Sequence, residues 1–512
     1  MKKKLTFIFT TVLFALTTGI TAFADSEEEM TEAAEQAASV NISGAFSALT
    51  NCVPALVVAV ISILAIALVC IFGGRLKKKL DGSSASSMMN AFIAAFSASG
   101  IICLVFAFLT DGVSWSDMMH TVDESVLYPQ FSDYYQSMQT AARGLFYNLS
   151  EEFTPFGIII YYLLAQFVPA SLVTSTSAVY YSSLLKNQPG LMMYLFIVIL
   201  YLVLIYRLSR SQLRKNDLHM RDEVTVFLFM LSYPVIYCVE QGNITALSLA
   251  LAMFFILYRN SESKTYRRIC TAALAISAAI TPFTLIFALL LFFDKGKKGI
   301  KTFLCICGLF VVLFLAPCFI TGFRCALYYA ESFLTINAEE FIVGNVSLAN
   351  LLVFFGVKSK FVLYTVFILS ELLALVTLIA LPKTWQKLAA AVYIILNIPS
   401  VSENVTYLFI LIPLVYLLSE KEHKTADWLY LLCFSLIVIP IPEWYYFDSG
   451  NFETLLAAFN LPYISSANEL ISLTAIQGLF VLLIYSMATS MKASKESAAP
   501  PSESEVKSEI NG

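Results

Sequence analysis

An aspartate set among aromatic residues is the feature of this sequence best suited to acid–base chemistry. Asp133 lies close to Phe131, Tyr134 and Tyr135 in a polar stretch, 111–154, that holds seven acidic residues. A carboxylate within hydrogen-bond reach of a hydroxyl group can take its proton. Aromatic rings with a polar handle suit contacts to a sugar ring and to the edge of a lipid layer. Asp133 is therefore a candidate general base, with Tyr134 and Tyr135 beside it.

Other interpretations of this stretch stay open. Ser132 or Asp133 could be the N-cap of a helix expected over 134–143, because short polar side chains accept hydrogen bonds from the first helical turn. Asp111 and Asp117 are rival bases, since they follow the preceding apolar run more closely than Asp133 does.

Two glutamates fall within apolar stretches. Glu403 lies in a short polar break, and ionisable groups at membrane depth are costly and usually functional. Substrate binding is its predicted role, unless the break reaches the headgroup region, where a charge costs little. Glu371 lies in an uninterrupted apolar run, where pairing or packing is the expected role.

The composition predicts that these residues belong to an all-α polytopic membrane protein. Of the 512 residues, 58% are hydrophobic and 13% are charged, whereas soluble domains are about 45–50% apolar and about 25% charged. Apolar runs of about 18 residues or more recur along the chain, and each is a candidate span. The net charge of −4 and the absence of a basic patch speak against a nucleic-acid partner. The three histidines have no partners at metal-ligand spacing, so we expect no metal site.

The N-terminal residues predict export. Residues 1–24 combine three lysines, an apolar stretch and Ala22-Phe23-Ala24, which is the pattern of a signal peptide, with an uncleaved anchor as the alternative. Residues 25–51 then form an acidic extracytoplasmic segment, and 52–89 an additional span with its cytoplasmic loop. The expected location is a bacterial plasma membrane.

Lysine and arginine in short loops mark the cytoplasmic side of a membrane protein. Such clusters occur at 75–79, 207–221, 259–268, 295–301, 383–387 and 421–424. They leave 111–154 as a large first extracytoplasmic loop, which places Asp133 outside. The tail, 489–512, is polar and is expected to be disordered in the cytoplasm.

Three apolar runs have lengths that do not fit whole spans. The run 270–294 has basic loops on both sides and holds Thr281-Pro282 at its centre, yet two spans need about 40 residues. The runs 388–418 and 155–188 pose the same problem. Irregular backbone at membrane depth requires surrounding protein or a watery cavity. We therefore expect about 11–15 transmembrane or half-spanning helices around a cavity that opens outward.

The order of several short motifs resembles the GT-C superfamily of membrane glycosyltransferases, and most of all glycosyltransferase family 87, the polyprenyl-phosphomannose-dependent mannosyltransferase type. The matching elements are Asp133-Tyr134-Tyr135, Gln241-Gly242-Asn243, Pro282, Asn345-Val346-Ser347, and Ser400 to Asn404 ahead of Tyr407 and Pro413. The family's lysine before the proline is Ala279 here, and the histidine of the last element is missing. The resemblance covers 90–418 and implies a GT-C-like domain over 90–488.

This resemblance implies a hexose, mannose in the first instance, as the transferred sugar, a polyprenyl-phosphate sugar as donor and a glycan or glycolipid as acceptor, with no cofactor. It implies that Asp133 is the base. The implied substrate contacts are Tyr134, Tyr135, Arg143, Gln241, Asn243, Asn345, Glu403 and Asn404.

The leaving phosphate would need cations or a helix N-terminus. Arg143 and Arg324 are the arginines of the expected outer loops, and each could equally be solvated or interfacial. Asn243 could begin a helix that faces the anion, or simply cap it. Two other functions remain open: a lipid-linked sugar transporter or flippase, which also uses broken helices, and a non-catalytic partner in envelope assembly.

Overall fold

The computed structural model describes residues 82–109, 131–149, 153–168, 188–216, 219–293, 298–338, 342, 345–399, 404–441 and 467–498. The expected signal peptide, the acidic segment and the additional span lie outside these residues, as do Asp111, Asp117 and Glu403.

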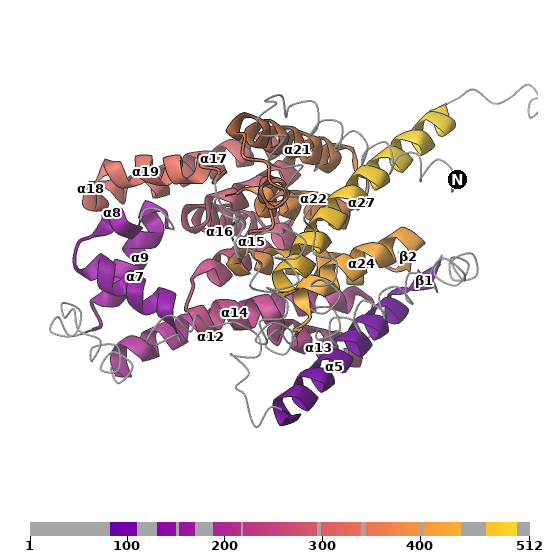
Figure 1. Ribbon diagram of the computed structural model, residues 1–512, viewed down its shortest axis with the longest axis horizontal. Helices are drawn as coiled ribbons and strands as arrows, with labels where there is room; N and C mark the ends of the chain where they lie inside the picture. The colour runs from indigo at the N-terminus through magenta and orange to yellow at the C-terminus, as the bar shows by residue number, and fades with distance from the viewer. Residues whose placement is uncertain are drawn as a thin grey trace, which may run out of the picture.

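Helices account for nearly all the secondary structure of the described residues (Figure 1). Five helical stretches are long and apolar enough to cross a membrane: Ala85–Val105, Met192–Leu213, Gly299–Thr321, Lys360–Ala380 and Ile471–Lys492. They belong to α5 (Ala85–Leu109), α12 (Gln188–Leu213), α17 (Lys298–Leu315) with α18 (Cys318–Thr321), α21 (Lys360–Ala380) and α27 (Ala467–Ala498). The predicted class, an all-α polytopic membrane protein, is confirmed. Helix α27 continues past residue 488, so the segment 489–512 begins as helix.

Two further helices, α13 (His219–Met230) and α14 (Tyr233–Gln241), are together long and apolar enough for one span but meet at 42°, as in a broken span or a re-entrant loop. Pro234 lies in the first turn of α14. Proline lacks an N–H and fits only the first turn of a helix, so a new helix starts there. This bend was not predicted, although Pro234 was the available signal of it.

The predicted break at Thr281-Pro282 is confirmed. Helix α16 (Lys264–Ile280) ends there, and the 3₁₀ helix η2 (Pro282–Phe292) follows. Buried hydroxyl groups surround the break: Ser277 Oγ lies 2.8 Å from Ser248 Oγ of α15 (Thr245–Tyr258) and donates to Thr284 Oγ1 at 3.0 Å. These bonds supply partners for polar groups that have no water at this depth.

The second predicted break is also confirmed, between α22 (Thr384–Asn397) and η3 (Asn404–Ile410), which leads into α23 (Leu411–Leu418). Asn397 holds the end of α22: its Nδ2 donates to Ser370 Oγ at 2.8 Å and to Glu371 Oε1 at 2.7 Å. Its Oδ1 accepts from the backbone N–H of Leu348 at 2.8 Å. Glu371 therefore pairs within the bundle, as expected.

The third run begins with α9 (Pro155–Ala165), and most of its remainder lies outside the described residues. Thr154 caps α9 by accepting from the Gly157 N–H at 3.0 Å, and its hydroxyl also donates to the Ala279 carbonyl next to the first break. The start of α9 is thereby attached to the end of α16.

Burial divides the bundle into a core and a periphery. Residues of α22 such as Trp385, Leu388 and Tyr393 are inaccessible to solvent, and α22 lies at the centre of the molecule (Figure 1). A helix that is apolar on all sides belongs in such a position. By contrast, only 11% of the most apolar 18 residues within Gly299–Thr321, the stretch that includes α17, is buried inside the protein. This is expected for a helix that faces lipid.

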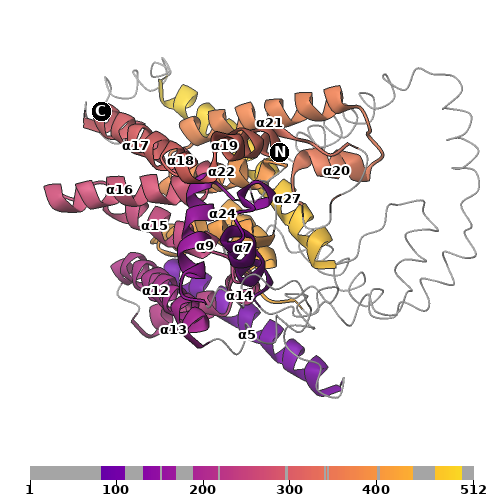
Figure 2. The ribbon, with the colours of Figure 1, turned by 90° about the vertical axis from the view of Figure 1, so that its left-hand side faces the viewer.

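The remaining elements complete the described chain. They are α7 (Ser132–Ala142), α8 (Phe146–Leu149), η1 (Arg214–Asn216), α19 (Phe323–Leu334), α20 (Leu348–Phe354), α24 (Thr425–Val438), and the strands β1 (Ser83–Ser84) and β2 (Glu422–His423). The strands pair antiparallel with Ser83 opposite His423. Helices α7, α8, α9, α18 and α19 gather at one end, and Figure 2 views the molecule from that side.

Candidate active site

Helix α7 positions Asp133 as its second residue. The helix starts after Phe131, whose φ of 61° is the only positive φ of a non-glycine residue in the described chain. The Phe131 N–H donates to the Glu240 carbonyl at 2.5 Å, which ties the entry of α7 to the end of α14. No side chain caps α7. The alternative that Ser132 or Asp133 is the N-cap is therefore wrong, because the chain enters through a left-handed residue that is held by its backbone.

The Asp133 carboxylate is instead bonded to Asn243. Asn243 Nδ2 donates to Asp133 Oδ2 at 3.0 Å. Asn243 Oδ1 accepts from the backbone N–H of Thr245 at 3.0 Å and from Thr245 Oγ1 at 2.8 Å. The amide thus caps the start of α15 with its oxygen and binds the carboxylate with its nitrogen. The N–H of Thr245 is thus occupied by Asn243, so the start of α15 has one N–H fewer to donate to a phosphate.

Gly242 allows α7 and α14 to approach each other closely. It has a φ of +80°, and a Cβ atom at this position would lie 2.6 Å from Tyr134 Cβ and 3.2 Å from Tyr134 N. Left-handed backbone is readily adopted only by glycine. Gly242 is therefore required both for the turn that follows α14 and for the contact that brings Asn243 to Asp133.

Aromatic rings form one wall of this site. Tyr194 of α12 packs against Tyr134 and Phe131, with ring centroids 4.5 and 5.3 Å apart. Two hydroxyl groups bind backbone carbonyls: Tyr134 donates to Gly190 at 3.0 Å and Tyr194 to Val239 at 3.1 Å. Tyr135 is only 3% exposed, and its hydroxyl has no hydrogen-bond partner among the described residues. Of the two tyrosines beside Asp133, Tyr135 is thus the one whose hydroxyl has no partner among the described residues.

The surroundings of Asp133 favour its protonated form. Burial raises the pKa of the Asp133 carboxyl above the ordinary range of aspartate, and the hydrogen bond from Asn243 opposes this shift. A buried carboxylate has lost part of its hydration and binds a proton more readily. A general base of raised pKa is better matched to proton transfer near neutral pH than an ordinary aspartate.

The other predicted substrate contacts lie on several elements of the fold. Gln241 is buried at the end of α14, next to Gly242. Asn404 is the first residue of η3, which packs against α14 and α15. Arg143 is the C-cap of α7, about 15 Å from Asp133 along an axis that rises about 1.5 Å per residue. Arg143 is therefore separated from the Asp133–Asn243 pair.

Asn345 belongs to a second region, where asparagines hold a loop in place. Its Oδ1 accepts from the Ser347 N–H at 3.0 Å, and its Nδ2 donates to the Pro399 carbonyl. Asn350 Nδ2 in turn donates to the Asn345 carbonyl at 2.7 Å and to the Ile342 carbonyl at 2.8 Å. Asn345 thus connects this loop to the residues that follow α22.

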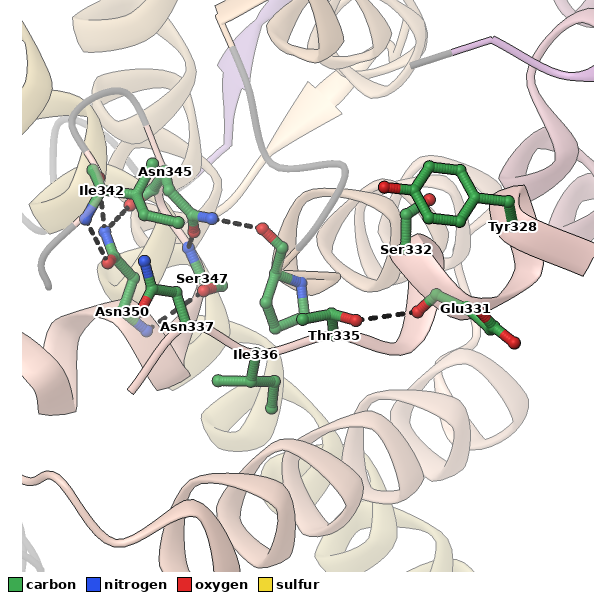
Figure 3. A pocket seen from close by; sticks show the side chains of 11 residues that line it. Tyr328, Glu331, Ser332, Thr335, Ile336, Asn337, Ile342, Asn345, Ser347 and Asn350 are labelled. Carbon is green, nitrogen blue, oxygen red and sulfur yellow. Dashed lines mark hydrogen bonds between the residues drawn. The ribbon is translucent and has the colours of Figure 1, made fainter. Parts of the chain in front are cut away.

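The loop borders a cavity of about 420 Å³, which we call the Asn345 cavity (Figure 3). One side of it comes from α19 and the residues that follow, and the other from the asparagine loop and Pro399. Figure 3 shows Tyr328, Ser332 and Glu331 on one side and Asn345, Ser347 and Asn350 on the other. The residues of α19 carry no motif and were not predicted to line a site; a tyrosine and an acid one helical turn apart (328 and 331) were the available signal.

The role of Gly242 in the close approach of α7 to α14 was also not predicted, although a glycine between Gln241 and Asn243 signals a turn. Among the described residues, no three His, Cys, Asp or Glu side chains gather around a point that could hold a metal ion.

The fold and the site together define a class of protein. The chain is a multi-pass membrane protein with half-length helices, in which a carboxylate, held by an amide and lined by tyrosines, can take a proton from a hydroxyl group. The model of glycosyltransferase family 87 matches residues 154–440, more than half of the chain. This chain belongs to glycosyltransferase family 87, and it is a membrane glycosyltransferase.

The matched stretch includes Gln241, Asn243, Asn345 and Asn404, whereas Asp133 and its tyrosines precede it. Neither the curated proteins nor the solved structures include a match to this chain.

Proposed function

We propose that this chain transfers a hexose, mannose in the first instance, from a polyprenyl-phosphate carrier to a glycan or glycolipid acceptor on the outer face of a bacterial plasma membrane. The observation that carries the proposal is the hydrogen bond between Asp133 and Asn243. It attaches a loop that precedes the family match to the start of a helix inside that match. A carboxylate is thereby held against the part of the chain that the family model matches.

In this mechanism Asp133 takes the proton of the acceptor hydroxyl as the oxygen attacks the anomeric carbon. The new C–O bond forms as the bond from the anomeric carbon to the phosphate oxygen breaks. The electron pair of that bond leaves with polyprenyl phosphate, and the configuration at the anomeric carbon inverts. Tyr135 is suited to bind a sugar hydroxyl, because its own hydroxyl is buried without a partner among the described residues.

The distribution of basic residues supports an outward-facing site. Helix α15 (Thr245–Tyr258) is about 20 Å long at about 1.5 Å per residue, with Asn243 just before its start and Arg259 just after its end. Arg259 opens the basic cluster 259–268, and such clusters mark the cytoplasmic side. The Asp133–Asn243 pair lies at the opposite end of the helix.

The test is transfer of labelled mannose from polyprenyl-phosphomannose by purified wild type and by Asp133→Asn. Asparagine keeps the size of the side chain and can still accept from Asn243, but it cannot take a proton. We expect the turnover to fall by about 10²-fold or more, the usual contribution of a general base. The matched control is Glu262→Gln, which removes an exposed carboxylate in the basic loop 259–268 and should leave turnover unchanged.

Equal turnover by wild type and Asp133→Asn would move the base to Asp111 or Asp117. If wild type binds polyprenyl lipid but transfers no sugar from any polyprenyl-phosphate donor, the lipid-linked sugar transporter becomes the better proposal. Turnover with a nucleotide sugar and no lipid carrier would refute the proposed donor.

A further inference from the structure

The Asn345 cavity has a buried floor and an exposed rim. Asn345, Ser347 and Asn350 are at most 5% exposed, and their side chains are bonded to the loop itself. Glu331 and Thr335 lie at the exposed rim. The floor is thus rigid before any ligand arrives, and the rim supplies the groups that can bind one. Such preorganisation is what a binding site requires.

The chemistry of the rim selects a class of ligand. Among the described residues that line the cavity, Glu331 is the only acidic one, and none is a lysine, arginine or histidine. Among the described residues, the Glu331 carboxylate has no hydrogen bond or ion pair. A phosphate would meet a negative charge here without a cation. A neutral molecule with several hydroxyl groups would instead donate to the carboxylate and meet the amide and hydroxyl groups around it.

An aromatic stack joins this cavity to the helix pair that follows Asp133. The rings of Tyr328 on α19 and Tyr147 on α8 are stacked with centroids 4.4 Å apart. Helix α8 follows α7 after a turn of three residues, and α8 packs against α19 (Figure 1). Tyr328, which lines the cavity, therefore contacts the segment 131–149 that contains Asp133.

We infer that the Asn345 cavity binds a neutral sugar unit of the acceptor, one or more units away from the sugar that receives the new bond. The inference rests on the proposed function and adds to it that the acceptor is an oligosaccharide chain rather than a single sugar. The cavity volume of 420 Å³ falls within the range of about 300–1,000 Å³ that is usual for small-molecule sites.

The experiment compares two acceptors, methyl mannoside and mannotriose, with wild type, Glu331→Gln and the control Glu262→Gln. Glutamine keeps the shape of the side chain and removes its charge. For mannotriose we expect KM to rise about tenfold in Glu331→Gln, as is typical when a hydrogen bond to a charged group is weakened. The KM for methyl mannoside and the KM for the lipid-linked donor should stay unchanged, as should kcat.

Calorimetric binding of mannotriose without donor gives a second measure that does not depend on turnover. Wild type should bind it, Glu331→Gln and the cavity-filling variant Thr335→Trp should bind it at least about tenfold more weakly, and inorganic phosphate should not compete. The inference is overturned if mannotriose binding and its KM are the same in all variants, or if wild type does not bind mannotriose. If binding depends on Glu331 but no transfer occurs with any donor, the cavity assignment stands and the proposed function fails.

Discussion

At the scale of single residues, the amide of Asn243 serves two partners at once. Its oxygen orders the first turn of α15, and its nitrogen holds the carboxylate of Asp133. Since the oxygen is committed to two donors from Thr245, the NH₂ group is the part that must face the aspartate. The protonation of Asp133 is thus connected to the structure of a helix end.

The exchange Asn243→Ala should change the pH dependence of transfer. Burial raises the pKa of Asp133, and the bond from Asn243 lowers it, so removal of the amide should raise this pKa further. Because the base must be ionised, activity is lost as the pH falls through this pKa. The acid limb of kcat/KM should therefore move to higher pH. The profiles of wild type and Asn243→Ala test this, with Asn260→Ala in a basic loop as the control. An acid limb that moves to lower pH would contradict the account.

Gly242→Ala should damage the site without touching a polar group. The new methyl would lie 2.6 Å from Tyr134 Cβ and 3.2 Å from Tyr134 N, so α7 would have to shift, and the positive φ would add strain. We expect a loss of turnover of at least about tenfold, as follows from a misplacement near 1 Å at a reacting centre. Gly308→Ala is the matched control, because nothing lies within 4 Å of its Cβ position. Equal loss in both variants would mean that the effect is not specific to this contact.

Residue types indicated this site only in part. The aspartate among aromatics and the Gln241-Gly242-Asn243 element were visible in the sequence, but a spacing of 110 residues between Asp133 and Asn243 contains no information about their contact. The left-handed Phe131 was not predictable either, because a bulky residue adopts that conformation only when its surroundings enforce it. Here the Glu240 carbonyl and the Tyr194 ring do so.

At the scale of elements, interrupted helices define the membrane core. The breaks after α16 and α22 were predictable, because basic loops on both sides left too few residues for whole spans and because Thr281-Pro282 stops a helix. The bend between α13 and α14 was not predicted, since its flanks have opposite sidedness and fit one span. The distribution of basic loops reveals a run that is too short for the membrane crossings it requires. It does not reveal a bend within one complete crossing.

The hydroxyl groups at the first break should contribute to stability. Ser277→Ala removes one hydrogen-bond partner from Ser248 Oγ and one from Thr284 Oγ1, while Ser248 Oγ keeps Thr281 Oγ1 and Thr284 Oγ1 keeps the Thr281 carbonyl. A hydrogen bond within a protein contributes about 0.5–1.5 kcal/mol to stability. We expect a lower Tm in detergent, measured by thermal unfolding. Thr365→Ala is the control, because that exposed hydroxyl binds only the carbonyl one turn earlier, Phe361. An unchanged Tm for Ser277→Ala would show that the break does not need this bond.

At the scale of the whole molecule, the fold brings together the first and last thirds of the described chain. The pairing of β1 with β2 is reinforced by the Trp428 indole, which donates to Ser83 Oγ at 3.0 Å across 345 positions of sequence. Ribosomes add about 5–20 residues per second, so Ser83 would wait on the order of 20–70 s for Trp428 to be made. During that interval α5 has been synthesised, but β1, which precedes it, cannot yet pair with β2. The pairing of β1 with β2 is thus a late step in the synthesis of the protein. An error in the insertion of any intervening span would prevent this pairing.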